Sequence, residues 1–528
     1  MNSQTTLRRL GNAAFCVAAL ATITACDDKV HWTEEPGGET QPEDNTVYDE
    51  WITFKPEGAT CADGTQYKYF VKFREGSENV LVLFEGGGAC WDYETCSNAA
   101  GTLAARGVDC VVNPTGDDCL PDNYADTYYG LPGGLPLDDY QDILKKFSWL
   151  SITDGRVAID TVLPLANSAN GVSPMGDWNL VFVPYCTADL YAGNRVAEYV
   201  DPTNPENTLT FRHVGLPNTL KVASELNELF PNVPEFAMNG CSAGGAGTLA
   251  TFPLFRSRME GIQKAFVFAD AGPFFPTPND DSPSAPLHNT VRESWNASSI
   301  FELLREEFPD KNIQEPEQMA EIYRLYAEHF PDDRFSVAHT QTDYNYSLYS
   351  YITFHGGFEH YRAKTAADAK RIYEYWKEDN DALVDLLEEL PNFSYYMPFW
   401  RQTNDSHCIS LIGIEDLPDY NTDPLAAFLN FIGSPSKYYY SGTEIEHDGR
   451  TWTYGDHVRM VLEDTDVINI FELDGEGPRM YCTPDYYDED LCKQAFGEST
   501  GDDGDDDGGT GDDGSDDGDG DDGDTDPV

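Results

Sequence analysis

The sequence predicts an α/β fold in which a mostly parallel sheet carries helices on both of its faces. Continuous apolar runs that end in turn residues, at 79–88 and 178–186, are typical of strands buried on both faces of a parallel sheet. Segments with apolar residues at helical spacing alternate with such runs along the chain. Since no linker or internal repeat interrupts this alternation, we expect one α/β body from 47 to 497.

The expected elements follow one another in a regular order. Strands are expected at 79–88, 178–186, 235–240, 264–272 and 392–400. Helices are expected at 218–230, 245–255, 299–308, 316–330 and 366–390. In the first of these helices Val222, Leu226 and Leu229 share one face, as in an amphipathic helix. The irregular stretch from 110 to 176 is expected to form loops that decorate the sheet.

The first 26 residues are typical of an export signal. Arg8 and Arg9 precede an apolar run that is too short to span a membrane, and small residues follow it. The letters ITAC that end at Cys26 resemble the lipobox of bacterial lipoproteins. We therefore expect a lipoprotein signal peptide at 1–25, a lipid on Cys26 and a tether at 26–46 that holds the exported body at an outer membrane or cell surface. The alternative is an ordinary signal peptide with a cysteine near its end.

Cysteine usage agrees with export. The chain has 12 cysteines, and setting aside Cys16 in the signal and Cys26 at the lipid site leaves an even number. An even number is expected where disulfide bonds form in an oxidising compartment. No pair has the spacing of a zinc site, so we expect no metal centre.

The net charge is extreme and is concentrated at the C-terminal end. The formal charge is −60, and the final 28 residues contain 14 aspartates and no basic residue. Such a charge disfavours nucleic acid and anionic lipid as partners. We expect 498–528 to be a disordered tail, because it lacks apolar residues to pack. Its carboxylates could bind Ca²⁺ weakly, and the alternative is a solvated spacer.

A candidate nucleophile lies in the run FAMNGCSAGGAGTLATF at 236–252. An expected strand leads into the turn Gly240-Cys241-Ser242-Ala243-Gly244, and an expected helix follows at once. Strand, tight G-x-S-x-G turn and helix are the three parts of a nucleophile elbow, in which small neighbours allow a strained turn to expose the serine hydroxyl. We therefore expect Ser242 to be a nucleophile.

A serine hydroxyl needs a base to remove its proton and a carboxylate to orient that base. Among the downstream histidines, His407 follows the expected late strand 392–400, where a catalytic loop would be delivered. In this kind of fold the acid lies between serine and histidine in the chain. Asp343 is the first choice, at the end of an expected strand, and Asp270 is the alternative. Asp270 could instead support a turn by accepting backbone hydrogen bonds.

An oxyanion hole needs backbone N–H groups that point at the substrate carbonyl oxygen. The run LFEGGGACW places three glycines directly after a strand, much like the glycine-rich turn of lipases and esterases. The expected donors are the N–H groups of Gly87, Gly88 and Ala243, the residue after the nucleophile.

Four motifs together resemble the pectin acetylesterase family, which includes the animal Notum carboxylesterases. They are LFEGGGACW, VPYCTADLYAGN, NGCSAGGAG and DSHC, in this order between about 80 and 410. The resemblance implies an α/β-hydrolase-like fold, with Ser242 as nucleophile, Asp343 as acid and His407 as base. It also implies an oxyanion hole built from the first glycine-rich turn and Ala243. The loop around Asp189 lacks a histidine that some relatives carry after this aspartate.

The resulting hypothesis is a secreted, membrane-tethered serine esterase that removes O-acyl groups, acetyl groups first, from a polysaccharide such as pectin. Its reaction passes through an acyl-enzyme and needs no metal or organic cofactor. One alternative is a lipid or long-acyl carboxylesterase, as in the Notum branch. Another is a non-catalytic surface adhesion protein whose acidic tail binds Ca²⁺. The presence of both Ser242 and His407 favours an enzyme.

Overall fold

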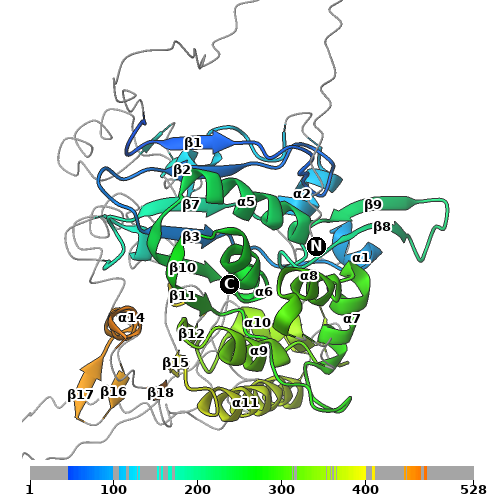
Figure 1. Ribbon diagram of the computed structural model, residues 1–528. Helices are drawn as coiled ribbons and strands as arrows, with labels where there is room; N and C mark the ends of the chain where they lie inside the picture. The colour runs from blue at the N-terminus through cyan, green and yellow to red at the C-terminus, as the bar shows by residue number, and fades with distance from the viewer. Residues whose placement is uncertain are drawn as a thin grey trace, which may run out of the picture. The chain divides into compact units, whose positions relative to one another are not determined.

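The structure is a computed structural model (Figure 1). It describes residues 46–98, 106–114, 118–127, 129–130, 152–153, 156–157, 164–168, 173–311, 313, 318–351, 354–356, 358–359, 362–363, 365–399, 407–410, 445–447, 449–464 and 469–471. All of these except Thr46 lie in the second of two compact units, Val47–Val528. The expected signal, tether, lipid site and acidic tail lie outside the described residues.

A nine-stranded sheet dominates the part of the chain that is described. In sheet order, its strands are β1 (Trp51–Phe54), β2 (Tyr69–Lys72), β7 (Asn179–Val183), β3 (Val80–Phe84), β10 (Val233–Cys241), β11 (Ile262–Asp270), β12 (Arg334–Ala338), β15 (Phe393–Met397) and β18 (Ile470–Phe471). The seven strands from β7 to β18 pair in parallel, whereas β1 with β2 and β2 with β7 pair antiparallel. The prediction of a mostly parallel sheet is confirmed.

Buried apolar runs form the central strands, as the sequence predicts. Every residue of β3 and of β7 is buried, because both faces of these strands are covered. Phenylalanines from successive elements pack in the core, and Phe335 of β12 stacks on Phe393 of β15 with ring centroids 4.6 Å apart. Burial of such large aromatic side chains supplies much of the free energy that stabilises a sheet of this size.

The helices connect the strands. Their bounds are α1 (Tyr93–Cys96), α2 (Arg106–Val112), α5 (Gly215–Leu229), α6 (Ala243–Arg258), α7 (Ala285–Trp295), α8 (Ser299–Glu307), α9 (Glu321–His329), α10 (Tyr344–Tyr351), α11 (Ala366–Glu388) and α14 (Tyr454–Glu463). The helix expected at 316–330 begins only at Glu321, after a turn at 318–320. The helix expected at 245–255 extends further at both ends and begins directly after Ser242.

Helices cover both faces of the sheet, and two neighbouring residues of β12 show this. Successive side chains of a strand point to opposite faces. Phe335 packs edge-on against Phe252 of α6, with ring centroids 5.0 Å apart. Ser336 instead forms a hydrogen bond with the Nε2 atom of His457 on α14, at 2.9 Å. The helices α6 and α14 therefore lie on opposite faces, which confirms the predicted α/β fold with helices on both faces of the sheet.

Smaller elements surround the main sheet. They are the hairpin β8 (Arg195–Val200) and β9 (Thr208–His213), the strands β4 (Tyr129–Gly130), β5 (Ile152–Thr153) and β6 (Arg156–Val157), the pairs β13 (Phe358–Glu359) with β14 (Arg362–Ala363) and β16 (Ile445–His447) with β17 (Arg450–Trp452), and the 3₁₀ turns Tyr124–Thr127, Pro164–Ala166 and Pro309–Lys311. In Figure 1 the hairpin β8–β9 extends sideways beyond the ends of β7 and β3. None of the helices in the described ranges is both long and apolar enough to cross a bilayer.

Candidate active site

Ser242 occupies a sharp turn between β10 and α6, as the sequence predicts. β10 ends at Cys241 and α6 begins at Ala243, so a single residue makes the turn. Ser242 has φ 58° and ψ −124°, a backbone conformation that is costly for a residue with a side chain. Its N–H donates to the carbonyl of Asp270 at 2.9 Å, and its carbonyl accepts from Ala246 at 3.0 Å. The strained backbone is thus held from both sides, and the serine stays partly exposed.

The small residues around Ser242 are required by close backbone contacts. A Cβ atom on Gly240 would lie 2.5 Å from backbone atoms of Gly244, and a Cβ atom on Gly244 would lie 2.3 Å from the carbonyl oxygen of Phe84. Real Cβ contacts do not occur at these distances, so α6 can approach β10 and β3 only where side chains are missing. The turn is therefore built to bring Ser242 above the carboxyl ends of the strands.

Asp343 and His407 are in direct contact. The His407 Nδ1 atom lies 2.7 Å from Oδ2 of Asp343. Asp343 is fully buried, and His407 is 7% exposed. The carboxylate is oriented by the helix that follows, because its Oδ1 atom accepts the N–H of Tyr346 in the first turn of α10 at 2.9 Å. One oxygen thus caps a helix while the other holds the imidazole.

The placement of Asp343 differs from the sequence prediction in one respect. We expected it to end a strand, but β12 ends at Ala338 and Asp343 directly precedes α10. The intervening turn is fastened to the end of β15, since the N–H of Gln341 donates to the carbonyl of Pro398 at 2.9 Å and the Thr342 hydroxyl donates to the carbonyl of Phe399 at 2.6 Å. These hydrogen bonds hold the segment after β12 as a turn, so Asp343 lies beyond the end of the strand.

Asp270, the alternative acid, ends β11 and holds the backbone next to His407. Its Oδ1 atom accepts the N–H of Ile409 at 2.9 Å. Its Oδ2 atom accepts the N–H and the hydroxyl of Ser410, at 2.6 and 2.7 Å. Burial raises the pKa of the Asp270 carboxyl, and these hydrogen bonds oppose that rise. Asp270 therefore supports the loop, and the imidazole ring is bonded to Asp343.

A disulfide bond joins the serine turn to the histidine loop. Cys241, the residue before Ser242, is bonded to Cys408, the residue after His407, with Cα atoms 5.6 Å apart. The two sulfur atoms and one ring nitrogen of His407 all lie within 4.8 Å of one another. The chain segments that carry Ser242 and His407 are therefore close neighbours in space, although 167 positions separate the two cysteines.

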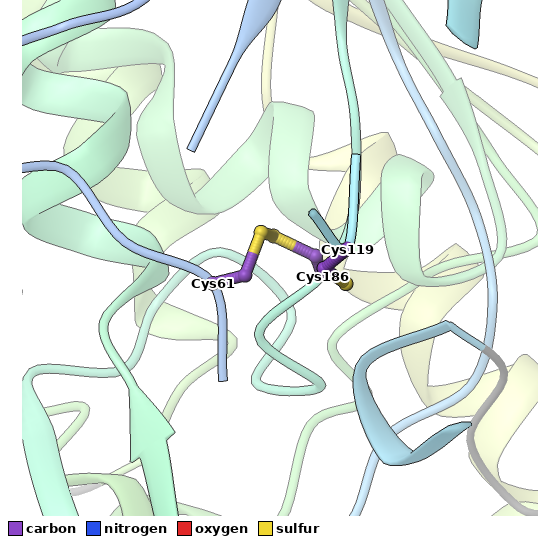
Figure 2. A group of neighbouring side chains, drawn as sticks. All are labelled: Cys61, Cys119 and Cys186. Carbon is purple, nitrogen blue, oxygen red and sulfur yellow. A yellow bond between two sulfur atoms is a disulfide. The ribbon is translucent and has the colours of Figure 1, made fainter. Parts of the chain in front are cut away.

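Three further disulfide bonds lie in the N-terminal part of the body. They are Cys61–Cys186, Cys90–Cys96 and Cys110–Cys119. Figure 2 shows the first of these, with Cys119 beside it. In the part of the chain that is described, each cluster of cysteine and histidine with metal-like spacing contains disulfide-bonded sulfur, which is not a thiolate ligand. The expectation of disulfide bonds is confirmed for eight cysteines, and Cys482 and Cys492 lie outside the described residues.

The glycine-rich turn after β3 lies against the serine. A Cβ atom on Gly86 would be 3.5 Å from the Ser242 Cβ atom and 2.7 Å from the carbonyl oxygen of Cys241. Gly87 and Gly88 have φ of 135° and 65°, which side chains disfavour. Ala243 is the first residue of α6, and the first N–H groups of a helix have no partner within it. The three expected oxyanion donors thus belong to segments that meet at Ser242.

Glu85, directly before this turn, is a residue that the sequence motifs did not single out. Its buried carboxylate accepts the N–H of Tyr185 at 2.7 Å and the hydroxyl of Tyr124. Burial raises the pKa of Glu85, and the charge of Arg106 opposes that rise. The Glu85 carbonyl accepts the hydroxyl of Tyr191 at 2.8 Å. Glu85 thereby fixes the start of the glycine-rich turn. The sequence signal that could have identified this residue is an acidic side chain directly after an apolar strand.

Asp189 lies in the second family-like motif and is fully buried. It accepts the hydroxyl of Thr187 at 2.7 Å and the N–H groups of Tyr191 and Gly215 at 3.1 and 2.7 Å. Burial raises the pKa of its carboxyl to about 7. Because the Tyr191 hydroxyl in turn donates a hydrogen bond to the Glu85 carbonyl, the loop of Asp189 supports the start of the glycine-rich turn. Among the described contacts, the Asp189 carboxylate bonds only groups of its own loop and the N–H of Gly215, which is a structural role.

Aromatic residues connect the glycine-rich turn with α10. The Tyr349 hydroxyl forms hydrogen bonds with the backbone of Ala89. Trp91 packs on Tyr349 and Phe354 with ring centroids 5.6 and 5.7 Å apart. Trp91 also belongs to a buried cluster with Trp295. The helix that is capped by Asp343 therefore also contacts the glycine-rich turn, so the expected acid and the expected oxyanion donors are held by the same helix.

Comparisons with known proteins agree with these motifs. The pectinacetylesterase family model matches residues 43–107 and 157–320. This match includes the glycine-rich turn and Ser242, and it ends before Asp343 and His407. Among solved structures, the chain is similar to the Wnt deacylase Notum from Drosophila, with a TM-score of 0.44, 16% identity and coverage of 80% of this chain and 95% of that chain.

Curated relatives are similar over shorter stretches. Pectin acetylesterase 7 of Arabidopsis thaliana is 24% identical over 220 residues, 41% of this chain and 43% of the relative. Palmitoleoyl-protein carboxylesterase notum2 of Xenopus laevis is 24% identical over 143 residues, 26% of this chain and 19% of the relative. The chain thus spans less than half the length of these relatives. Together with the family model, these similarities support a relationship of the chain to the pectinacetylesterase family.

Proposed function

We propose that this protein is a serine ester hydrolase in which Ser242, His407 and Asp343 form a catalytic triad. The observation that carries the proposal is the buried Asp343–His407 hydrogen bond of 2.7 Å, on a loop that a disulfide bond joins to the residue before Ser242. A carboxylate on Nδ1 keeps the proton on that nitrogen, so the other ring nitrogen is left as a proton acceptor. This is the arrangement that activates a serine hydroxyl.

The reaction follows from these placements. Ser242 Oγ attacks the ester carbonyl carbon while its proton passes to Nε2 of His407. The carbonyl oxygen becomes an oxyanion, which the N–H groups of Gly87, Gly88 and Ala243 stabilise. When the intermediate collapses, the bond to the alcohol oxygen breaks and His407 returns the proton to the departing alcohol. Water, deprotonated by His407, then attacks the acyl-enzyme and releases the acid, which restores Ser242.

The substrate that we propose is an O-acyl, and first an acetyl, ester of a polysaccharide such as pectin. Support comes from the family and from relatives whose names are pectin acetylesterases. Other relatives are named palmitoleoyl-protein carboxylesterases, which makes a long-acyl ester the competing substrate class. A non-catalytic surface adhesion protein, the third hypothesis, would not need the buried carboxylate on His407.

An acyl-chain series tests the substrate class. We expect p-nitrophenyl acetate to be cleaved with higher kcat/KM than the octanoate and longer esters, and acetate to be released from acetylated pectin or xylan. Higher kcat/KM for long chains would favour the long-acyl alternative. A fluorophosphonate probe tests the mechanism without a substrate, since mass spectrometry should locate the adduct on Ser242. An adduct on another serine, or none, would contradict the triad.

We also propose that the protein is an exported lipoprotein of the bacterial envelope, tethered through Cys26. The support is the ITAC run and the polar segment after it. Triton X-114 partitioning tests this, since the native protein should enter the detergent phase and the Cys26→Ser variant should not. Deletion of 498–528 should leave esterase activity unchanged, with or without added Ca²⁺, if the acidic tail is a solvated spacer.

A further inference from the structure

The disulfide bond between Cys241 and Cys408 lies directly beside the proposed nucleophile and the proposed base. Cys241 directly precedes Ser242, and Cys408 directly follows His407. The bond therefore links the chain segment of the nucleophile to the chain segment of the base, through the immediate neighbour of each residue. Both cysteines are buried, 7% and 1% exposed, and they pack with Ala271 in a small cluster of their own. The other three disulfide bonds in the described residues connect cysteines between positions 61 and 186.

The two catalytic segments differ in how their own backbone is held. Ser242 is flanked by a strand and a helix, whose hydrogen-bond ladders fix it from both sides. The described residues 407–410 belong to no helix or strand, and Cys408 has φ 59°. A loop in this conformation needs outside contacts to keep one geometry. The position of His407 relative to Ser242 therefore depends on what ties this loop to the sheet.

Three adjacent strands supply those ties, each with a different chemistry. The segment after β12 holds the imidazole through the Asp343 carboxylate. The end of β11 holds Ile409 and Ser410 through the Asp270 carboxylate. The end of β10 holds the loop through the disulfide bond of Cys241. Of these three ties, the last is the one that connects to the strand carrying the nucleophile, so it acts on the distance between Ser242 and His407.

We infer that the Cys241–Cys408 disulfide bond is a positioning element of the esterase, which holds the general base at the nucleophile and so contributes to kcat. The inference rests on the proposed triad. A displacement of about 1 Å between reacting groups can cost about 10²-fold in rate. Because the bond acts on the placement of the nucleophile and the base, its loss should lower kcat and leave KM nearly unchanged.

The variant Cys241→Ala/Cys408→Ala tests this, with Cys110→Ala/Cys119→Ala as the control. The control removes a bond that closes a loop of 9 positions and is not adjacent in the chain to any proposed catalytic residue or oxyanion donor. Both variants should lose thermal stability, and the first should lose more because it releases a loop of 167 positions. Assayed well below both melting temperatures, the first should lose about 10- to 100-fold in kcat with KM within about twofold. The control should keep kcat within about threefold. Equal losses in both variants, or an unchanged kcat in the first, would overturn the inference.

A second measurement uses the native protein, in case the variants do not fold. Graded treatment with tris(2-carboxyethyl)phosphine, followed by alkylation and peptide mass spectrometry, gives the reduced fraction of each disulfide bond. Activity should fall with the reduction of Cys241–Cys408 and return on reoxidation. The inference would be contradicted if the loss of activity followed the reduction of another disulfide bond, or if the protein kept full activity with this bond reduced. Failure of the proposed function would look different, since Ser242→Ala would then remain active in the oxidised protein.

Discussion

The carboxyl ends of β11 and β12 each deliver a buried aspartate to the same short loop, yet the two carboxylates do different things. Asp343, beyond β12, contacts the ring of His407. Asp270, at the end of β11, contacts only backbone and hydroxyl donors of Ile409 and Ser410 among its described hydrogen bonds. The comparison teaches that burial and proximity to a histidine do not define a catalytic acid. The donor that faces the carboxylate defines its role.

The largest effect on kcat should come from replacing the proposed nucleophile or the proposed base. Ser242→Ala and His407→Ala should each fold and lose at least about 10³-fold in kcat, because only oxyanion and binding contributions remain. The double variant should lose little more, since triad members act as one unit. Steady-state kinetics with a p-nitrophenyl ester and circular dichroism check this. Additive losses would mean that the two residues do not act in one mechanism.

Asp343→Asn should have the next largest effect, about 10²- to 10⁴-fold in kcat. The amide oxygen can still accept the N–H of Tyr346, but the amide nitrogen would then face Nδ1 of His407 and donate to it. The histidine would carry its proton on the nitrogen that should accept from Ser242. The melting temperature should change by only a few degrees. A folded Asp343→Asn enzyme with near-native kcat would exclude Asp343 as the acid.

Asp270→Asn should show the opposite pattern. Both carboxylate oxygens accept N–H groups, so the amide nitrogen must face a donor and leave it unsatisfied, at a cost of about 1–3 kcal/mol. Urea unfolding should measure that loss of stability, and kcat should fall by only about 3- to 30-fold as the loop loosens. If Asp270→Asn were the more damaging of the two variants to kcat, the roles of Asp343 and Asp270 would have to be exchanged.

Asp189 extends the comparison through pH. Like Asp270 it accepts only neutral donors among the residues described, and burial raises its pKa to about 7. An unfolded aspartate ionises near pH 4, so this carboxyl stabilises the fold fully below about pH 4 and loses that contribution as pH rises to about 7. The stability advantage of the native protein over Asp189→Asn should therefore be larger at pH 5 than at pH 8, by on the order of 1–3 kcal/mol.

Urea unfolding of both proteins at the two pH values measures this difference. Burial lowers the pKa of His213 to about 3 and that of His288 to about 4, which gives native stability the opposite dependence on pH. Both proteins contain these histidines, so the comparison between them cancels that contribution. A gap that stays the same between pH 5 and pH 8 would show that Asp189 is already ionised in the folded protein at pH 5.

Local patterns made the sheet and the nucleophile predictable. Apolar runs indicated β3, β7, β10, β11 and β15, and the small residues around Ser242 indicated the turn that the structure contains. These signals lie within a few residues of one another, where backbone sterics act directly. The glycine-rich turn was predictable for the same reason.

Contacts between distant segments were not predictable in the same way. Nothing local distinguishes Asp343 from Asp270, because the difference lies in which donors 64 and 139 positions away reach each carboxylate. The pairing of Cys241 with Cys408 and the anchoring of Glu85 by Tyr124 and Tyr185 are of the same kind. The sequence prediction placed Asp343 at the end of a strand, because the start of α10, and with it the role of Asp343 as a helix cap, could not be read from the local pattern.

The order of the strands along the chain sets the time at which this protein can first act. The proposed nucleophile and oxyanion donors lie next to β3, β10 and α6, whereas the proposed base follows only after β15. During synthesis and export the N-terminal segments emerge first. A chain that has emerged only as far as α6 would present its serine without acid or base and would be inert toward esters. Esterase activity should therefore appear only after the chain has folded at least as far as the loop that carries His407.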